Sequence, residues 1–261
     1  MGEIVDEAWH CLRRSPLRGD LEMIQLIDVH KSFAGQKVLN GVDLRIPKGE
    51  ITVIIGASGV GKSVLLKHMI GLLQPDRGRI LVDGTDLATL SPKGLVGIRQ
   101  KFGMLFQGAA LFDSLNVFDN VAFPLTEHTS LSHEEIKRKV REKLALVGLH
   151  GVDNKMPDEL SGGMKKRVGL ARAIILEPEV ILYDEPTTGL DPIMTDSVDN
   201  LILSMQQKLR VTSVVISHDI KSTFDIADQI AMIYDGKIIE AGAPDEFRAS
   251  KNELVARFIG E

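Results

Sequence analysis

The sequence predicts an α/β fold with a β-rich N-terminal part and a mostly parallel sheet in its second half. Runs rich in β-branched residues, separated by turns that contain glycine, dominate the segment 24–56. After residue 165, segments with helical periodicity alternate with short apolar runs, which is typical of buried parallel strands joined by crossover helices. A chain of 261 residues can bury a full core, as one large domain or two small ones.

Four strands are expected in the first third of the chain. Residues 1–22 carry mixed charge and weak periodicity, so they are interpreted as a short N-terminal extension ahead of a domain at 23–261. The fourth strand contains an Asp83-Gly84 pair, which favours a tight turn. The expected strands are IQLIDVHKSF (24–33), KVLNGVDLRI (37–46), EITVIIG (50–56) and RILVDGTDL (79–87).

A long helix is expected at 131–149. Ser132 and Glu135 form a capping-box pattern at its start, in which each side chain satisfies a backbone N–H group of the other residue. The Lys and Arg residues within this segment are interpreted as a solvated face. Apolar residues recur at helical spacing: Ile136, Val140, Leu144 and Val147.

The rest of the chain alternates between helices and strands, with no internal repeat, low-complexity tract or long linker. This alternation predicts βαβ units and therefore a parallel sheet. The sequence predicts helices at 167–176, 197–209 and 221–229, strands at 179–185 and 211–219, and a hairpin turn at Asp235-Gly236.

Composition limits the classes of partner. The 44% hydrophobic and 26% charged residues are ordinary for a globular protein, and the net charge of −5 lacks the basic excess of a dedicated nucleic-acid binder. We therefore expect no nucleic-acid partner. The longest apolar runs, such as ITVIIGA, are too short to cross a bilayer, and Asp6 stands where a myristoylation signal needs Ser or Thr. Any membrane role is expected to be peripheral, through a partner.

Cysteine usage and the N-terminus indicate a reducing, cytosolic setting. The single cysteine, Cys11, cannot form an internal disulfide. The segment MGEIVDEAWHCLRRSP begins acidic and has no apolar core of signal-peptide length.

The strongest chemical signal is GASGVGKS, residues 56–63, which matches the phosphate-binding P-loop pattern in full. It follows the strand ITVII and precedes the helix SVLLKHMIGLL, so a glycine-rich turn with a chance GKS is the weaker interpretation. The glycines allow successive N–H groups to face an anion at a helix N-terminus, Lys62 reaches the β- and γ-phosphates, and the Ser63 hydroxyl can coordinate Mg²⁺. The expected ATP contacts are Gly56, Ala57, Ser58, Gly59, Val60, Gly61, Lys62 and Ser63.

Two adjacent carboxylates in VILYDEP, residues 180–186, indicate hydrolysis. The apolar run puts Asp184 at the carboxyl end of a buried strand, where it can hold Mg²⁺, while Glu185 points toward an attacking water. A strand that ends in a solvated acidic turn is the alternative, and it would be favoured if no P-loop preceded it. His218 follows the strand SVVIS and could reach a γ-phosphate, although a lone His is usually structural.

Together these segments resemble the nucleotide-binding subunits of ABC transporters from residue 23 to about 250. GASGVGKS corresponds to Walker A, FQ ending at Gln107 to the Q-loop, LSGGM to the signature, VILYDEP to Walker B, TGLD to the D-loop and His218 to the switch histidine. The resemblance implies an ABC ATPase fold of the P-loop NTPase class, with a β-rich N-terminal subdomain, a RecA-like core and an inserted helical subdomain at about 108–175. It also implies catalytic roles for Glu185, His218 and Gln107, Mg²⁺ ligands Ser63, Gln107 and Asp184, and adenine stacking on Phe33.

The resemblance further implies a head-to-tail homodimer that encloses two ATP molecules, each between the P-loop of one subunit and LSGG of the other. Ser161 offers a hydroxyl, and Gly162 and Gly163 let N–H groups approach a γ-phosphate at a helix N-terminus. The family usually has Gln at position 164. Met164 departs from that pattern, and we interpret it as a packing residue.

LSGGM and FQGAALFDSLNVFDNVAFPL (106–125) narrow the resemblance to the ATPases of MCE-type, or Mla-type, phospholipid transporters. This subgroup implies a membrane permease, an MCE-type lipid-binding protein and an accessory subunit as partners, and a peripheral position on the cytoplasmic face of the inner membrane. The apolar segment from Leu111 to Leu125 could accept a coupling helix of the permease. Its apolar residues could equally be core residues of the helical subdomain.

Two other function classes stay open. One is a soluble ABC ATPase of chromosome maintenance, translation or Fe–S assembly. Ser161 follows Lys62 by only 99 positions, which leaves no room for a long coiled-coil insertion, and a single P-loop excludes tandem cassettes in one chain. The Fe–S assembly type remains compatible with this length. The other is a scaffold that binds nucleotide without hydrolysing it, which the intact Glu185 and His218 disfavour.

Overall fold

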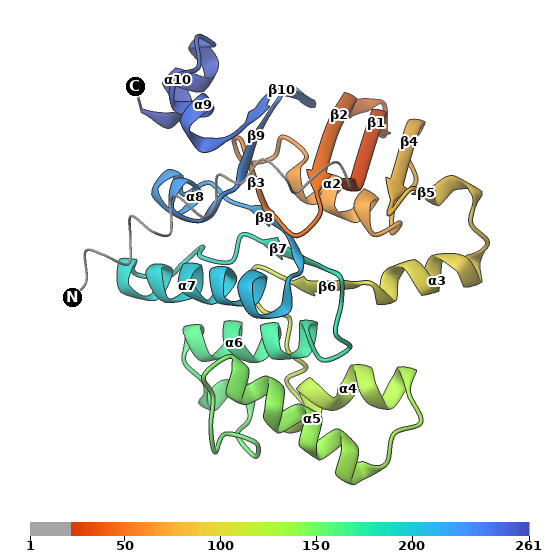
Figure 1. Cartoon of the computed structure of the whole chain (residues 1–261), viewed down its shortest axis with the longest axis vertical. Coiled ribbons are helices and arrows are strands. Elements are labelled where there is room, and N and C mark those ends of the chain that lie inside the picture. The colour runs from red at the N-terminus through yellow and green to blue at the C-terminus, as the bar shows by residue number, and fades with distance from the viewer. Residues whose placement is uncertain (1–21, 261) are drawn as a thin grey trace.

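The protein contains two β-sheets and a set of helices that extends away from them (Figure 1). The computed structural model describes residues 22–260, so Cys11 and the predicted extension 1–22, apart from Glu22, lie outside the described residues. No helix within 22–260 combines the length and the apolar character that a membrane span requires.

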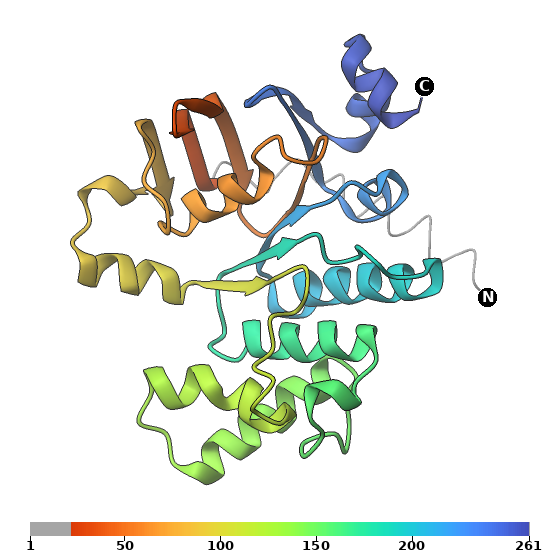
Figure 2. The same ribbon diagram turned by 180° about the vertical axis from the view of Figure 1, so that it is seen from behind.

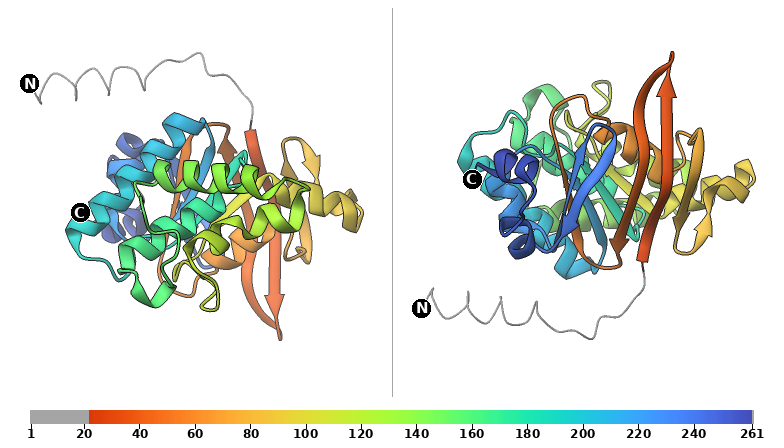
Figure 3. Two further views of the ribbon diagram at one scale, coloured as in Figure 1. Left: turned by 90° about the horizontal axis from the view of Figure 1, so that it is seen from below. Right: turned by 90° about the horizontal axis from the view of Figure 1, so that it is seen from above.

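The first sheet is antiparallel and comes from the N-terminal part of the chain. Its order is β2-β1-β4-β5, and β1 pairs with both β2 and β4. The view from above shows the long strands β1 and β2 side by side (Figure 3). This sheet confirms the β-rich N-terminal part that the sequence predicts. Its strands are β1 (Glu22–Phe33), β2 (Gln36–Pro47), β4 (Arg77–Val82) and β5 (Thr85–Asp86).

The second sheet has the order β10-β9-β3-β8-β7-β6, with parallel pairing from β9 to β6 and an antiparallel edge strand, β10. Strands β3 and β8 are buried along their whole length, as expected for apolar runs covered on both faces. The predicted parallel sheet is thereby confirmed. Its strands are β3 (Ile51–Ile55), β6 (Phe102–Leu105), β7 (Val180–Asp184), β8 (Thr212–Ile216), β9 (Gln229–Tyr234) and β10 (Lys237–Gly242).

Several helices differ in extent from the sequence prediction. The helix after the P-loop, α2 (Lys62–Met69), ends early, whereas α7 (Pro192–Leu209) begins five residues before the predicted 197. Asp191 caps α7 by accepting a hydrogen bond from the amide of Met194, which explains the earlier start. The other helices outside the segment between β6 and β7 are α3 (Pro92–Gln100), α8 (Ile220–Ile226), α9 (Pro244–Arg248), α10 (Glu253–Ile259) and the 3-10 turn Leu87–Thr89.

Three helices between β6 and β7 form one end of the molecule, opposite the first sheet, and the view from behind shows the same arrangement (Figure 2). They are α4 (Val117–His128), α5 (His133–Leu146) and α6 (Gly162–Ala173), and each packs against the other two. The predicted capping box is present, because Glu135 Oε2 accepts from the Ser132 amide at 2.8 Å. A 3-10 turn, Pro157–Glu159, precedes α6.

Candidate active site

The predicted P-loop, the two acidic residues and His218 meet at one edge of the second sheet. Strand β8 lies between β3 and β7, and Ile216 of β8 is in register with Ile54 on one side and Asp184 on the other. The P-loop and His218 begin directly after these strand ends. Because parallel strands present their carboxyl ends at the same edge, segments about 120 and 155 residues beyond Lys62 come together there.

The P-loop has a backbone that only glycine adopts easily. Gly56 has φ 151°, and a Cβ atom there would lie 2.4 Å from the carbonyl oxygen of Ile233. Gly61 is the N-cap of α2 with φ 102° and has no side chain to occupy the first N–H groups of the helix. The loop therefore presents free N–H donors at a helix N-terminus, which is the arrangement that a phosphate group fits.

Lys62 lies inside the P-loop. Its Nζ donates hydrogen bonds to the carbonyl oxygens of Gly56 at 2.7 Å and Ala57 at 2.9 Å. Burial lowers the pKa of Lys62, and the negative charges of Glu185 and Asp184 oppose that shift. The two carboxylates thus help to keep the buried ammonium group charged.

Ser63 and Asp184 form a pair of oxygen ligands. Ser63 Oγ donates to Asp184 Oδ1 at 3.1 Å. Burial raises the pKa of Asp184, and the hydrogen bond from Ser63 lowers it. A hydroxyl and a carboxylate are ligands that suit Mg²⁺, and a divalent cation beside Asp184 would favour the charged carboxylate. Among residues 22–260 there is no cluster of three or more His, Cys, Asp or Glu side chains that could hold a metal alone, so a Mg²⁺ here would need phosphate and water oxygens as well.

Glu185 is held by two neighbours at the end of β7. Thr188 Oγ1 donates to Glu185 Oε2 at 3.0 Å, and His218 Nδ1 lies 3.7 Å from the same oxygen. Glu185 adopts the left-handed backbone region, with φ 49°, which is uncommon for a residue with a side chain. The Glu185 side chain is 21% exposed and that of His218 is 52% exposed, so both can meet a solvent molecule or a bound phosphate.

Gln107 lies in an exposed segment after β6 that α6 holds in place. The buried Lys166 donates through Nζ to the carbonyl oxygen of Gln107, and Arg172 Nη2 donates to the carbonyl oxygen of Ala109 at 2.8 Å. Burial lowers the pKa of both cations, and the charge of Glu185 opposes the shift at Lys166. Lys166 and Arg172 cannot be identified from the sequence, because their partners are backbone atoms about 60 positions earlier in the chain.

The LSGGM segment begins α6. Ser161 is the N-cap, and its Oγ accepts from the amide of Met164 at 3.3 Å. Gly163 is buried, and a Cβ atom there would meet Cε of Met194 at 1.8 Å. The Met164 side chain is partly buried and packs on the hydrophobic core, as predicted for a packing residue. Within the described chain no hydrogen bond joins residues 161–163 to the P-loop.

Phe33 ends β1 and is 42% exposed. Lys31 Nζ lies 5.6 Å from the ring centroid, and the same ammonium is bound to Asp76 Oδ1 at 2.8 Å. The exposed ring can therefore stack on a planar base, while Lys31 is held at its side.

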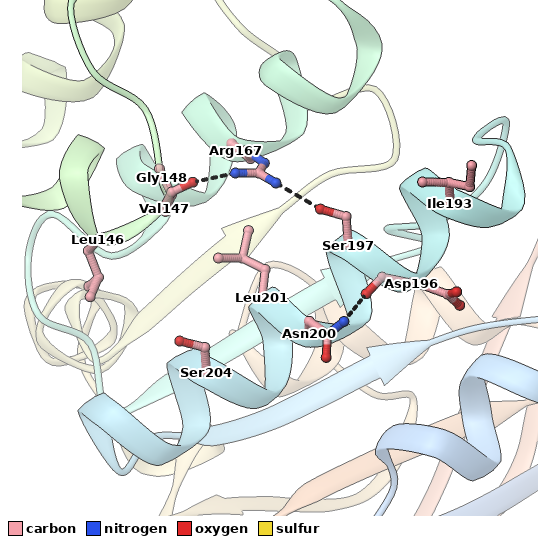
Figure 4. A pocket seen from close by; sticks show the side chains of 10 residues that line it. All are labelled: Leu146, Val147, Gly148, Arg167, Ile193, Asp196, Ser197, Asn200, Leu201 and Ser204. Carbon is pink, nitrogen blue, oxygen red and sulfur yellow. Dashed lines mark hydrogen bonds between the residues drawn. The ribbon is translucent and has the colours of Figure 1, made fainter. Parts of the chain in front are cut away.

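Arg167 joins α6 to two neighbouring elements (Figure 4). Its Nη1 donates to the carbonyl oxygen of Val147 at 3.0 Å, and its Nη2 donates to Ser197 Oγ on α7 at 2.7 Å. Arg167, Val147 and Ser197 are among the residues that line a pocket of about 530 Å³. The sequence gives no sign of this role for Arg167, because its partners lie 20 and 30 positions away.

The apolar segment from Leu111 to Leu125 divides between core and surface. Val117 and Val121 are fully buried, whereas Phe112 and Phe123 are exposed and have ring centroids 4.9 Å apart. The two exposed rings line a second pocket, of about 550 Å³, between α3, β6 and α4. Phe118 instead packs against the core.

Comparisons with known proteins agree with this geometry. A family model described as "ABC transporter" matches residues 39–188. The chain is 45% identical over 226 residues to the "Intermembrane phospholipid transport system ATP-binding protein MlaF" of Haemophilus influenzae. The matched region covers 86% of each chain. The MlaF protein of Escherichia coli K12 is 41% identical over 237 residues, covering 91% of this chain and 88% of the relative.

A mycobacterial relative is similar but longer. The "Probable ribonucleotide transport ATP-binding protein mkl" of Mycobacterium tuberculosis H37Rv is 44% identical over 236 residues, or 90% of this chain. The present chain spans 66% of the length of that relative.

Solved structures share the fold. The cbiO1 protein of Clostridium perfringens, described as part of the ABC transporter complex cbiONQ, has a TM-score of 0.82 at 33% identity, covering 89% and 92% of the two chains. The ATP-binding cassette MJ0796, solved as a dimer bound to ADP and Pi, has a TM-score of 0.77 at 31% identity, covering 85% and 99%. The family match, the MlaF relatives and the assembled P-loop site together show that the chain belongs to the ABC transporter family of ATPases and is related to the MlaF proteins.

Proposed function

We propose that this chain hydrolyses ATP between the subunits of a homodimer and thereby drives phospholipid transport in the bacterial envelope. The meeting of Lys62, Ser63, Asp184, Glu185 and His218 at one sheet edge is the observation that carries the hydrolysis. The identity to MlaF proteins over at least 86% of this chain and of each relative supports phospholipid as the cargo.

Each residue of the site has a separate task in this proposal. The N–H groups of residues 56–63 and Lys62 bind the phosphates, and the ring of Phe33 stacks on adenine. Glu185 accepts a proton from the attacking water, and His218 contacts the γ-phosphate. Ser63, Asp184 and the side chain of Gln107 would hold Mg²⁺, and the bound ion would neutralise charge on the phosphates.

The second half of each site comes from the partner subunit in this proposal. Residues 161–163 make no hydrogen bond to the P-loop of their own chain, while the N-terminus of α6 is open at Ser161 and Gly162. A head-to-tail homodimer would bring this helix N-terminus to the γ-phosphate bound by the other subunit. The dimeric form of MJ0796 supports such an arrangement.

The relatives and one surface support the membrane partners of this proposal. We assign the permease to the pocket lined by Phe112 and Phe123, next to the helices of a subdomain at about 108–175. An MCE-type lipid-binding protein and an accessory subunit would complete the transporter. The chain would then act as a peripheral protein on the cytoplasmic face of the inner membrane.

Purification of the tagged full-length chain from detergent-solubilised membranes tests this function. We expect a permease to co-purify, phospholipid to be present in the complex, and phosphate release to depend on ATP and Mg²⁺. Phospholipid is favoured over ribonucleotide because the MlaF relatives match this chain over nearly their full length. Recovery with soluble Fe–S assembly proteins, and no permease, would support the alternative class instead.

A further inference from the structure

Asp199 on α7 is the only carboxylate that is buried among residues 22–260, with 6% of its surface exposed. Its Oδ1 accepts a hydrogen bond of 2.7 Å from Ser222 Oγ on α8. Ser222 is also buried. Since α7 otherwise turns apolar residues inward, such as Val198 and Ile202, a carboxylate at this position is not required for packing.

The position is costly for a charged group. Burial raises the pKa of Asp199 to about 6, the hydrogen bond from Ser222 opposes the shift, and the negative charges of Asp219, Asp225 and Asp196 add to it. A well-packed apolar residue would avoid that cost of desolvation. What the carboxylate does supply is a hydrogen bond that joins α7 to α8 at Ser222.

Ser222 belongs to the turn that carries His218. Asp219, the residue after His218, caps α8 and accepts from the Ser222 amide at 3.0 Å. Ser217, the residue before His218, accepts a hydrogen bond through Oγ from the Asp219 amide at 3.0 Å. The backbone on both sides of His218 is thus fixed to the first turn of α8, and Asp199 fixes that turn to α7.

Helix α7 is in turn connected to Glu185. The segment from Glu185 leads to Asp191, the N-cap of α7, and Thr188 within it holds the Glu185 carboxylate. Glu185 therefore leads into α7 and His218 leads into α8. The buried Asp199–Ser222 hydrogen bond joins these two helices.

We propose that Asp199 is a positioning residue for the ATPase reaction: through Ser222 it fixes the start of α8 and so sets the place of His218 relative to Glu185. The proposal rests on the function proposed above, in which His218 contacts the γ-phosphate. Asp199 touches neither ATP nor water in this role.

Turnover by the purified full-length chain tests the proposal. Asp199→Leu keeps the branching and the number of heavy atoms of the side chain but removes the hydrogen bond, so kcat should fall about 10-fold with KM for ATP changed less than about twofold. Asp199→Asn retains a hydrogen-bonding group and should keep kcat within about threefold. Asp196→Asn, which alters the exposed α7–α8 ion pair with Lys221, is the matched control and should match the wild type.

A double-mutant cycle separates positioning from a structural role. In a His218→Ala background, Asp199→Leu should lower kcat by less than about twofold, because its effect acts through the missing imidazole. The ring NMR signal of His218, assigned by its loss in His218→Ala, should shift in Asp199→Leu and in Ser222→Ala but not in Asp196→Asn. The Ser222→Ala variant provides the same test if Asp199→Leu does not fold.

Three results would overturn the proposal: normal kcat in the folded Asp199→Leu variant, an equal loss in the His218→Ala background, or an unchanged His218 signal in Asp199→Leu and Ser222→Ala. Full activity of His218→Ala is a different outcome. It would remove His218 from the reaction, and with it the catalytic role of Asp199, while the NMR comparison would still report whether Asp199 sets the position of the ring.

Discussion

His218 Nδ1 lies 3.7 Å from Glu185 Oε2, although the two residues are 33 positions apart in the chain. The pairing of β7 with β8 brings them together, since Asp184 is in register with Ile216. The hydroxyl of Thr188 fixes the same carboxylate oxygen at 3.0 Å. The carboxylate is therefore oriented before any substrate arrives, as a general base requires.

Glu185→Gln should abolish most hydrolysis while leaving ATP binding intact. The amide keeps the shape of the side chain and can still accept from Thr188, but it cannot take a proton from water, so kcat should fall about 10²- to 10⁴-fold. The variant should accumulate as an ATP-bound dimer, which gel filtration with ATP would detect. Glu179→Gln, at the residue directly before β7, is the control and should keep normal phosphate release. Near-normal turnover by Glu185→Gln would show that Glu185 has no role in the reaction.

Met164→Gln should keep ATPase activity within a few-fold, about 1 kcal/mol in the activation barrier. Met164 packs on the core and only its backbone amide contacts Ser161, so a side chain of similar length can replace it. Ser161→Arg should still bind ATP at its own P-loop but fail to form a productive dimer, because a long cation fills the space at the start of α6. Equal inactivity of the two folded variants would contradict the packing role of Met164.

Phe112→Asp should weaken permease binding at least 10-fold and leave ATP hydrolysis by the isolated chain within about twofold. Phe112 is 43% exposed and lines the second pocket, so the substitution puts a charge on the surface rather than in the core. Co-purification with the permease measures the effect. Phe118→Asp should instead lower the melting temperature, because Phe118 packs on the core. Full permease binding by folded Phe112→Asp would show that the permease binds elsewhere.

Asp199→Asn should make the protein more stable than the wild type at pH 8. The pKa of Asp199 is about 6 in the folded state, above the ordinary 3.8, so the wild type loses stability as pH rises from about 4 to 6. A neutral Asn avoids that loss, an advantage of about 1–3 kcal/mol at pH 8 that shrinks toward pH 4. Urea unfolding at both pH values measures it, and an advantage that does not change with pH would contradict the assignment.

Much of the fold could be predicted because the strands follow the expected periodicity and most turns have typical residues. The capping box at Ser132 and the hairpin at Asp235 needed no tertiary information. Helix α3 could not be predicted because two glycines, Gly94 and Gly97, weaken its helical pattern. Strand β6 is only four residues long, and its neighbours identify it better than its own sequence does.

The start of α7 and the role of Asp199 could not be predicted from polarity. Ile193 is 80% exposed while Asp199 is buried, so both residues depart from the expected apolar-inside pattern. The P-loop residues were recognisable from spacing. The residues that support the site, Thr188, Lys166 and Arg172, became visible only with the tertiary contacts that they make.

The sheet order also determines when a growing chain can first bind nucleotide. Strand β3 lies between β8 and β9, so the strand that leads into the P-loop has neither neighbour until the chain reaches residues 212–234. At ribosomal rates of about 5–20 residues per second, roughly 10–30 s separate the synthesis of the P-loop from that of its neighbours. Pairings over such distances also form slowly. We therefore expect ATP to stabilise the finished domain and not the nascent N-terminal half of the chain.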